Sequence, residues 1–118
     1  MKPHQGQPVV TAGVDLDGAP AAIILVHGRG ASAESIIELA DVLGASTFAA
    51  LAPQAAGHTW YPNSFLAPIA QNEPGLSSGL QAIDDLVRKA EEAGIPKSRI
   101  VLGGFSQGAC LASEYVAR

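Results

Sequence analysis

The sequence is poor in three features that would define its partners or its compartment: cysteine, basic clusters and long apolar runs. Its 118 residues contain one cysteine, Cys110, which excludes an internal disulfide and a cysteine-based metal site. Seven Lys and Arg stand against eleven Asp and Glu, a formal charge of -4 at pH 7, so no basic face for nucleic acid is expected. No apolar run reaches the roughly 18 residues of a membrane helix, and we therefore expect no membrane span.

The N-terminal segment also lacks the features of an export signal. Residues 1–20 hold a single Lys and no apolar stretch followed by a small-residue cleavage site. Because the lone cysteine fits a reducing compartment, this favours a cytoplasmic location. Aromatic residues make up only 5% of the chain and charged residues 15%, whereas apolar residues reach 47%. The composition predicts one globular domain, residues 1–118.

Apolar periodicity predicts an alternation of strands and helices along the chain. We expect strands at residues 8–17, 21–26, 47–52 and 99–103. We expect helices at residues 32–43, 76–90 and 107–118. Ser32 is the predicted N-cap of the first helix, and Gly44 and Gly94 are the predicted ends of the first two. This order predicts an α/β fold in which a mostly parallel sheet carries helices on both faces.

Three loops are expected at one edge of this sheet. Residues 27–31, 53–75 and 104–108 each follow a strand, and α/β proteins of this type bind ligands outside the carboxyl ends of their strands. The loop at 53–75, which carries Trp60 and Tyr61, exceeds the ~2 to 6 residues usual for a strand-to-helix connection. The functional site is expected at this edge.

Residues 104–108 read Gly-Phe-Ser-Gln-Gly and match the G-x-S-x-G pattern of a nucleophile elbow. In that pattern a tight strand-to-helix turn exposes the serine hydroxyl. Gly104 and Gly108 remove the Cβ atoms that would clash where strand and helix approach closely. The motif follows an apolar strand and opens a helix with an apolar stripe, which is the context it requires. Ser106 is therefore the candidate nucleophile; the alternative is a glycine-rich turn in which the serine caps a helix.

The turn His27-Gly28-Arg29-Gly30 predicts the second part of the site. It can direct the backbone N–H of Arg29 into the pocket, and the N–H of Gln107 follows the serine directly, so these two groups are the predicted oxyanion hole. The Arg29 side chain is expected to reach solvent or a structural ion pair, with an acidic group of the substrate as the alternative partner. We expect His27 to brace the loop rather than to act as a catalytic base.

Together these segments resemble the phospholipase/carboxylesterase family of α/β-hydrolases, which includes bacterial carboxylesterases and acyl-protein thioesterases. The similar segments are I-I-L-V-H-G-R-G, W-Y-P-N-S-F and P-K-S-R-I-V-L-G-G-F-S-Q-G-A, in the family's order. The resemblance implies an α/β-hydrolase fold without a cofactor or metal, Ser106 as nucleophile, and the N–H groups of Arg29 and Gln107 as oxyanion hole. It also implies that Trp60 and Tyr61 form part of an acyl-pocket wall; packing of a long loop is their alternative role.

The order of the catalytic triad leads to a further expectation. In this fold the acid and the base follow the serine, yet every Asp and His precedes Ser106, and Glu114 is the one acid after it. We therefore expect the chain to be the N-terminal portion of a longer domain and to be nearly inert by itself. It would leave an apolar sheet edge open, to be covered by a C-terminal fragment of the same protein or by a second copy.

Three hypotheses remain for the function. The first is a serine hydrolase that cleaves small carboxylic esters or thioesters through an acyl-enzyme on Ser106. The second is a non-catalytic binding module that retains the pocket without the triad. The third uses His58, from a loop at the same sheet edge, as the base for Ser106. A dienelactone-hydrolase-like enzyme is a near neighbour of the first hypothesis, although that family typically has cysteine in the place of Ser106.

Overall fold

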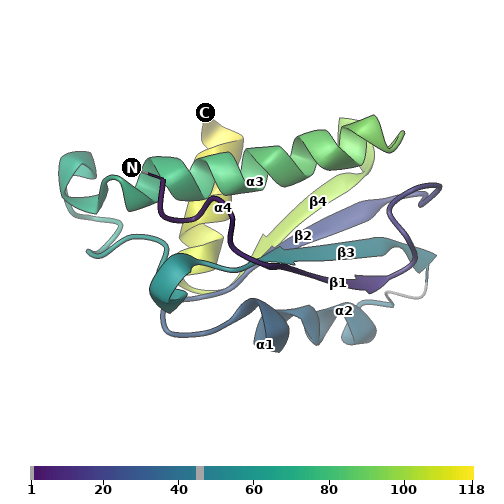
Figure 1. Cartoon of the computed structure of the whole chain (residues 1–118), viewed down its shortest axis with the longest axis horizontal. Helices are drawn as coiled ribbons and strands as arrows, with labels where there is room; N and C mark the ends of the chain where they lie inside the picture. Colours follow the sequence, from purple (N-terminus) through teal and green to yellow (C-terminus); the bar gives the residue numbers. More distant parts are fainter. Residues whose placement is uncertain (1, 45–46) are drawn as a thin grey trace.

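Within residues 2–44 and 47–118, which the computed structural model describes, the chain forms a four-stranded sheet in the order β1-β3-β2-β4 (Figure 1). The strands are β1 (Val9–Gly13), β2 (Ala22–Val26), β3 (Ala49–Pro53) and β4 (Ile100–Gly104). β2 pairs in parallel with both β3 and β4, whereas β1 runs antiparallel to β3 at one edge. The predicted α/β class and mostly parallel sheet are confirmed.

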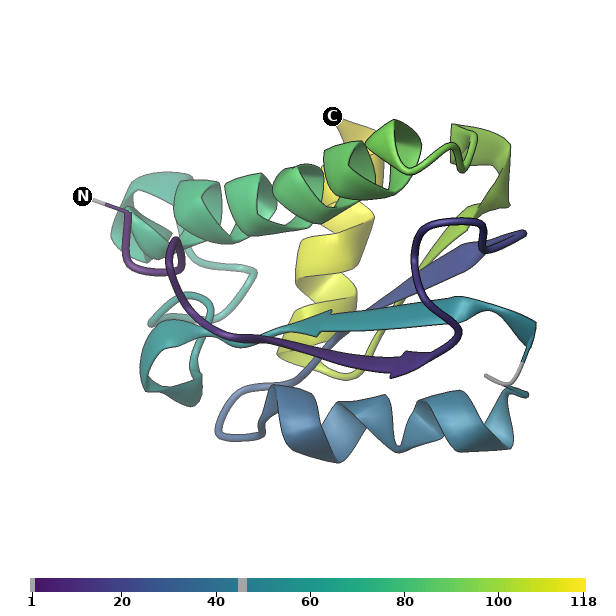
Figure 2. The same cartoon turned by 45° about the vertical axis from the view of Figure 1, so that its right-hand side comes forward.

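Helices cover both faces of this sheet, as the two views in Figures 1 and 2 show. The α-helices are α1 (Ala33–Ile37), α2 (Leu39–Val42), α3 (Gly75–Glu92) and α4 (Gln107–Ala117). The 3₁₀-helices are η2 (Ala56–His58), η3 (Ile69–Asn72) and η4 (Lys97–Arg99). α1 and α2 lie on one face, and α3 and α4 lie on the other. In the described part of the chain no helix is both long and apolar enough to cross a bilayer.

The helix predicted at residues 32–43 is divided into α1 and α2 at Glu38. Its predicted N-cap is confirmed, because the Ser32 hydroxyl accepts the Ser35 N–H at 3.1 Å. Gly44, at φ +84°, lies just after α2, as predicted. The strand predicted from residue 47 begins at Ala49. Two residues of the expected connection, 45 and 46, lie outside the described residues.

The core forms two main layers, one on each side of the sheet. Because side chains alternate along a strand, Ile24 and Val26 of β2 pack toward α3 and α4, whereas Leu25 packs toward α1. All five residues of β3 are buried, as expected for a strand covered on both faces. This packing fixes the carboxyl ends of β2 and β4 side by side, where the serine motif begins.

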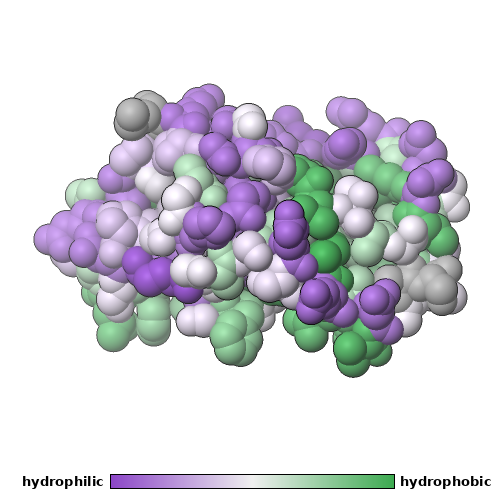
Figure 3. Space-filling model, turned by 60° about the horizontal axis from the view of Figure 1, so that its bottom comes forward, coloured by the Kyte–Doolittle hydropathy of each residue, from purple (hydrophilic) through white to green (hydrophobic). Residues whose placement is uncertain are grey.

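Most of the large hydrophobic side chains that are exposed among the described residues fall in three groups. They are Leu39, Val42 and Leu43 at α2; Phe65, Leu66 and Ile69 in the long loop; and Val101, Phe105 and Val116 along β4 and α4. Figure 3 shows hydrophobic residues along the lower border and near the middle of one face, with hydrophilic residues along its upper border. Val101 is 56% exposed on β4, the edge strand of the described sheet. The apolar edge expected from the sequence is thus present.

Candidate active site

Ser106 occupies the turn between β4 and α4 and has an unusual backbone conformation. Its φ of +54° and ψ of -119° lie in a region that non-glycine residues rarely adopt. Holding a residue in such a region costs about 1 to 3 kcal/mol, which the surrounding structure must offset. The side chain is exposed. The turn therefore presents the serine hydroxyl at the carboxyl edge of the sheet.

Two glycines allow this turn by their lack of a side chain. A Cβ on Gly108 would overlap the carbonyl groups of Val26 and His27 at the end of β2. A Cβ on Gly104 would lie 2.6 Å from the amide nitrogen of Ala109. Backbone atoms cannot move aside as a flexible side chain would, so only glycine fits at either position. This is the steric role that the sequence predicts for Gly104 and Gly108.

The loop that follows β2 runs directly beside the serine. A Cβ built on Gly28 would lie 3.4 Å from the Cβ of Ser106. Gly30 N–H donates to His58 O at 2.7 Å, and Gly108 N–H donates to Phe105 O at 3.0 Å. In contrast, the N–H groups of Arg29 and Gln107 have no hydrogen-bond acceptor among the described residues. Each of the two loops beside the serine thus supplies one unpartnered donor.

The side chains of these same two residues make contacts that the sequence did not indicate. The Arg29 guanidinium donates to Pro62 O at 3.0 Å and to Asn63 O at 2.9 Å. The side chain is exposed to solvent, as expected, but the alternative of an ion pair is not found among the described residues, since its partners are backbone carbonyls. The Gln107 carboxamide is buried; it accepts the Trp60 N–H and donates to Tyr61 O, both at 2.8 Å. Both side chains therefore hold one loop segment, residues 60–63.

The two aromatic residues of this segment occupy different environments. Trp60 is 0% exposed and lies between the rings of His4 and His27, with ring centroids 4.9 and 5.2 Å away, while its indole N–H donates to His27 O at 2.9 Å. Trp60 thus has the packing role that the sequence left as its alternative. Tyr61 instead borders a cavity of about 470 Å³. That cavity is lined mainly by apolar residues of the long loop, the start of α3 and α4, among them Phe65, Ile69, Leu76 and Ala109.

The buried histidines bond to backbone rather than to Ser106. His27 Nδ1 donates to Gly28 O at 2.8 Å, and its Nε2 accepts the Ala55 N–H at 3.0 Å, so this imidazole braces the loop as expected. His4, which the sequence did not single out, uses its Nδ1 to accept the Ala56 N–H at 3.0 Å and its Nε2 to donate to Trp60 O at 2.6 Å. Nothing in a short polar N-terminal segment indicates a contact 56 residues away.

These contacts predict that the protein loses stability in mildly acidic solution. Burial lowers the pKa of His4 and of His27 from the ordinary 6.5, and each ring also accepts a backbone N–H that protonation would displace. Below pH 6.5 the unfolded state therefore binds more protons than the folded state, and the free energy of unfolding falls as the pH decreases toward the folded pKa values. The thermal unfolding midpoint, measured from pH 7.5 to 5, should decrease.

A double variant in which both histidines are replaced by a residue that does not titrate provides the control for this prediction. Glutamine can accept one hydrogen bond and donate another, so His4→Gln with His27→Gln should flatten the decrease in the unfolding midpoint. His58→Gln is a further control, because it removes an exposed histidine whose ring does not contact Trp60. A pH profile that is as steep in the double variant as in the unsubstituted protein would contradict the assignment.

His58 braces the loop that contains Arg29. Its Nδ1 donates to Ala31 O at 2.8 Å, while its carbonyl accepts the Gly30 N–H. Among the hydrogen bonds of the described residues, none joins Ser106 Oγ to His58 or to another base. The hypothesis of His58 as a substitute base therefore has no supporting contact.

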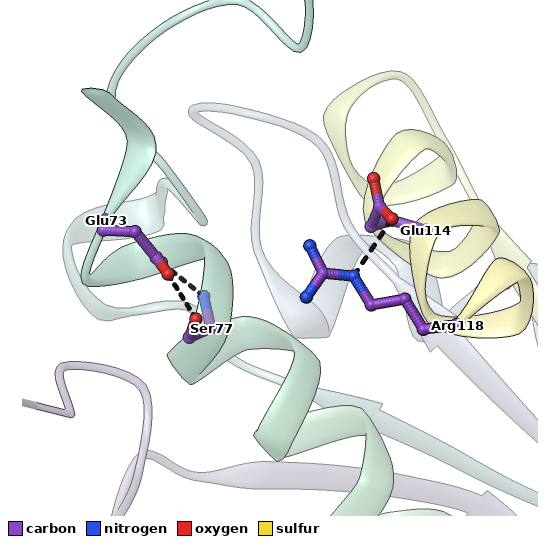
Figure 4. A network of polar contacts seen from close by, with 4 residues as sticks. All are labelled: Glu73, Ser77, Glu114 and Arg118. Atoms are coloured by element: carbon purple, nitrogen blue, oxygen red, sulfur yellow. Dashed lines mark hydrogen bonds and ion pairs between the residues drawn. The ribbon is translucent and has the colours of Figure 1, made fainter. Parts of the chain in front are cut away.

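The acids near this end of the molecule are engaged in local contacts (Figure 4). Glu114 pairs with Arg118 one turn along α4 at 3.1 Å. Glu73 accepts the Ser77 N–H at 2.7 Å and the Ser77 hydroxyl, and these two bonds lower the pKa of its carboxyl. No cluster of three or more metal-ligating side chains occurs among residues 2–44 and 47–118. The serine, the two N–H donors and the cavity are thus the chemically useful features here.

The comparisons agree with this geometry. The family model described as Phospholipase/Carboxylesterase matches residues 10–117. Acyl-protein thioesterase 1 of Cryptococcus neoformans is 30% identical over 108 residues, which cover 77% of this chain and 45% of that protein. Acyl-protein thioesterase 1 of Yarrowia lipolytica is 38% identical over 52 residues, 42% of this chain and 23% of that protein.

Solved structures show the same relationship. A phospholipase/carboxylesterase from Dyadobacter fermentans superposes with a TM-score of 0.90 at 44% identity, covering 94% of this chain and 53% of that one. Esterase PE8, at 23% identity and a TM-score of 0.60, shows the fold alone. The chain spans about half the length of the thioesterase from Cryptococcus neoformans and of the Dyadobacter fermentans protein.

Proposed function

Because this chain belongs to the phospholipase/carboxylesterase family, we propose that the whole protein is a serine hydrolase of small carboxylic esters or thioesters, with Ser106 as its acyl nucleophile. One observation carries the proposal: an exposed serine stands in a strained strand-to-helix turn, where two adjoining loops each have a backbone N–H without a partner among the described residues. A serine that only capped a helix would need neither the strain nor the second donor. The turn is then the nucleophile elbow, and the N–H groups of Arg29 and Gln107 form the oxyanion hole.

The chemistry follows from this arrangement. Ser106 Oγ attacks the carbonyl carbon while a base takes its proton, and the carbonyl oxygen becomes an oxyanion that accepts hydrogen bonds from the two N–H groups. Cleavage of the bond to the leaving group, which departs with the proton as an alcohol or a thiol, gives an acyl-enzyme. Water then attacks the acyl carbon and releases a carboxylic acid.

The acid and the base belong to the proposal as well. We place them in the remainder of the hydrolase domain, because the two relatives just compared are about twice as long as this chain. Residues 1–118 by themselves are then nearly inert, since an unactivated serine hydroxyl is a weak nucleophile. The same remainder would cover the exposed edge of β4, where cavities of about 770 and 460 Å³ lie beside Leu102. A cytoplasmic location completes the proposal and rests on the single cysteine.

The substrate's acyl group is proposed to enter the cavity beside Tyr61. This cavity of about 470 Å³ lies between the long loop and α4, the helix that begins directly after Ser106. Phe65, Ile69 and Leu76 give it a largely apolar wall. Such a wall favours a hydrocarbon chain over a charged group. The relatives named acyl-protein thioesterases are compatible with this substrate class.

Labelling of the whole protein with a fluorophosphonate probe tests the proposal, because this probe forms an adduct with activated serines. We expect one adduct, on the peptide that contains Ser106, and slower labelling in the presence of a medium-chain ester. Ser98, which is exposed in η4 and does not line the proposed acyl cavity, provides a control: Ser98→Ala should keep the label and Ser106→Ala should lose it. A properly folded protein that takes up no label would instead favour the non-catalytic binding module.

A further inference from the structure

The two proposed oxyanion-hole residues have side chains that hold the same four-residue segment. This segment, residues 60–63, is called the clamped segment below. Gln107 bonds to the main chain of Trp60 and Tyr61, and Arg29 bonds to the carbonyls of the next two residues. Four hydrogen bonds of 2.8 to 3.0 Å thus connect the residues that flank the nucleophile to one wall of the acyl cavity.

The Gln107 side chain can donate one hydrogen bond and accept another, as its two contacts require. Its carboxamide is both acceptor and donor, and it satisfies one N–H and one carbonyl of the clamped segment at a position that is only 6% exposed. A carboxylate could only accept hydrogen bonds, and an apolar side chain would leave both buried backbone groups unpaired. The glutamine side chain therefore has a function that is separate from that of its own backbone N–H.

Arg29 makes the complementary contact from the loop that follows β2. Its planar guanidinium presents parallel donors, which reach the successive carbonyls of Pro62 and Asn63. The side chain is exposed, so these bonds can be removed without opening the core. At its start the clamped segment is anchored independently, because Trp60 is fixed between two histidines. At its end Asn63 is also held, because its N–H donates to Asn72 Oδ1 at 2.8 Å. Loss of the side-chain bonds should thus displace Tyr61 and Pro62 while leaving Trp60 in place.

We propose that the Gln107 and Arg29 side chains are positioning residues that set the acyl-chain selectivity of the enzyme, by fixing Tyr61 and the cavity wall relative to the oxyanion hole. This inference rests on the proposed function. Both residues keep their backbone N–H whatever the side chain, so substitution separates the two roles. A displaced wall affects a long acyl chain, which fills the cavity, more than an acetyl group, which does not reach it.

The test compares Gln107→Met and Arg29→Met in the whole protein with acetyl and octanoyl esters of p-nitrophenol. We expect kcat/KM for the octanoyl ester to fall by on the order of ten- to a hundredfold in Gln107→Met and less in Arg29→Met. The loss should fall mainly on KM, and kcat/KM for the acetyl ester should fall less, so that the ratio of octanoyl to acetyl kcat/KM decreases. Fluorophosphonate should still label Ser106, at a rate that falls no more than acetyl ester hydrolysis does. Gln7→Met, in the exposed N-terminal segment, is the control and should match the unsubstituted protein.

The outcomes separate this inference from the proposed function. If Gln107→Met is poorly folded, the exposed Arg29→Met variant decides the question alone. An unchanged ratio of octanoyl to acetyl hydrolysis in the folded variants would overturn the positioning role while leaving Ser106 as nucleophile. An equal loss for both esters would overturn it too, since that result indicates damage to the oxyanion hole. An unsubstituted protein that hydrolyses neither ester and takes up no label would reject the proposed function and this inference together.

Discussion

Replacement of Ser106 by alanine is expected to reduce kcat for ester hydrolysis by the whole protein on the order of a millionfold, the loss seen when a serine nucleophile is removed from a triad. The reason is that no other group can form the acyl-enzyme at this position. The hydroxyl is the nucleophile that the strained turn exposes beside the two loops that carry the proposed N–H donors. The measurement is steady-state hydrolysis of a p-nitrophenyl ester.

Ser98→Ala is the control for this variant, because it removes an exposed hydroxyl from η4, away from the proposed acyl cavity. It should retain activity within about twofold, as surface substitutions usually do. Circular dichroism must show that Ser106→Ala is folded; alanine keeps the Cβ, so the backbone strain of the turn is unchanged. Residual activity above a tenth of the original in folded Ser106→Ala would contradict the assignment of the nucleophile.

The second large effect is expected from Gly108→Ala, which should lower the free energy of unfolding by about 3 to 5 kcal/mol. The added methyl group would overlap the carbonyls of Val26 and His27, so the start of α4 must move away from the end of β2. That movement would also displace the Gln107 N–H from the serine. Urea denaturation of the whole protein measures the loss of stability, and activity should fall with it.

Gly18→Ala is the matched control for the glycine prediction. Alanine is disfavoured at position 18 because the φ there is +82°. A Cβ at this position would nevertheless meet no atom within 4 Å. Its cost should be about 1 kcal/mol, the penalty of the left-handed conformation alone. If the two variants were equally stable, the close contact between α4 and β2 would not be what requires glycine at position 108.

The sequence was sufficient for the parts of the site that depend on local sterics. The turn at 104–108 could be predicted because a strand, two glycines and a helix follow each other within a few residues, so its geometry is encoded in one short segment. The N-cap at Ser32 and the end of a helix at Gly44 were predictable for the same reason. The sheet followed from the buried runs of β2 and β3.

Contacts between distant segments could not be predicted in this way. The carboxamide of Gln107 meets a loop 46 residues away, and His4 meets Trp60 across 56 residues. No periodicity indicates such pairs, because each depends on the three-dimensional arrangement of the loops and not on a local pattern of residues. The different environments of Trp60 and Tyr61 could not be predicted for the same reason. Neighbouring residues in an irregular loop have no fixed alternation of side-chain direction, so Trp60 lies in the core while Tyr61 borders a cavity.

Trapping the acyl-enzyme tests the central claim most directly. The whole protein is mixed with p-nitrophenyl octanoate, quenched in acid within milliseconds to seconds, digested and analysed by mass spectrometry. The account predicts an octanoyl group on Ser106, present before the steady state and removed as the ester is exhausted. Cys110, the free thiol on α4, provides an internal comparison in the same digest. Acylation of Cys110 rather than Ser106, or ester turnover with no acylated peptide at any time, would contradict the account.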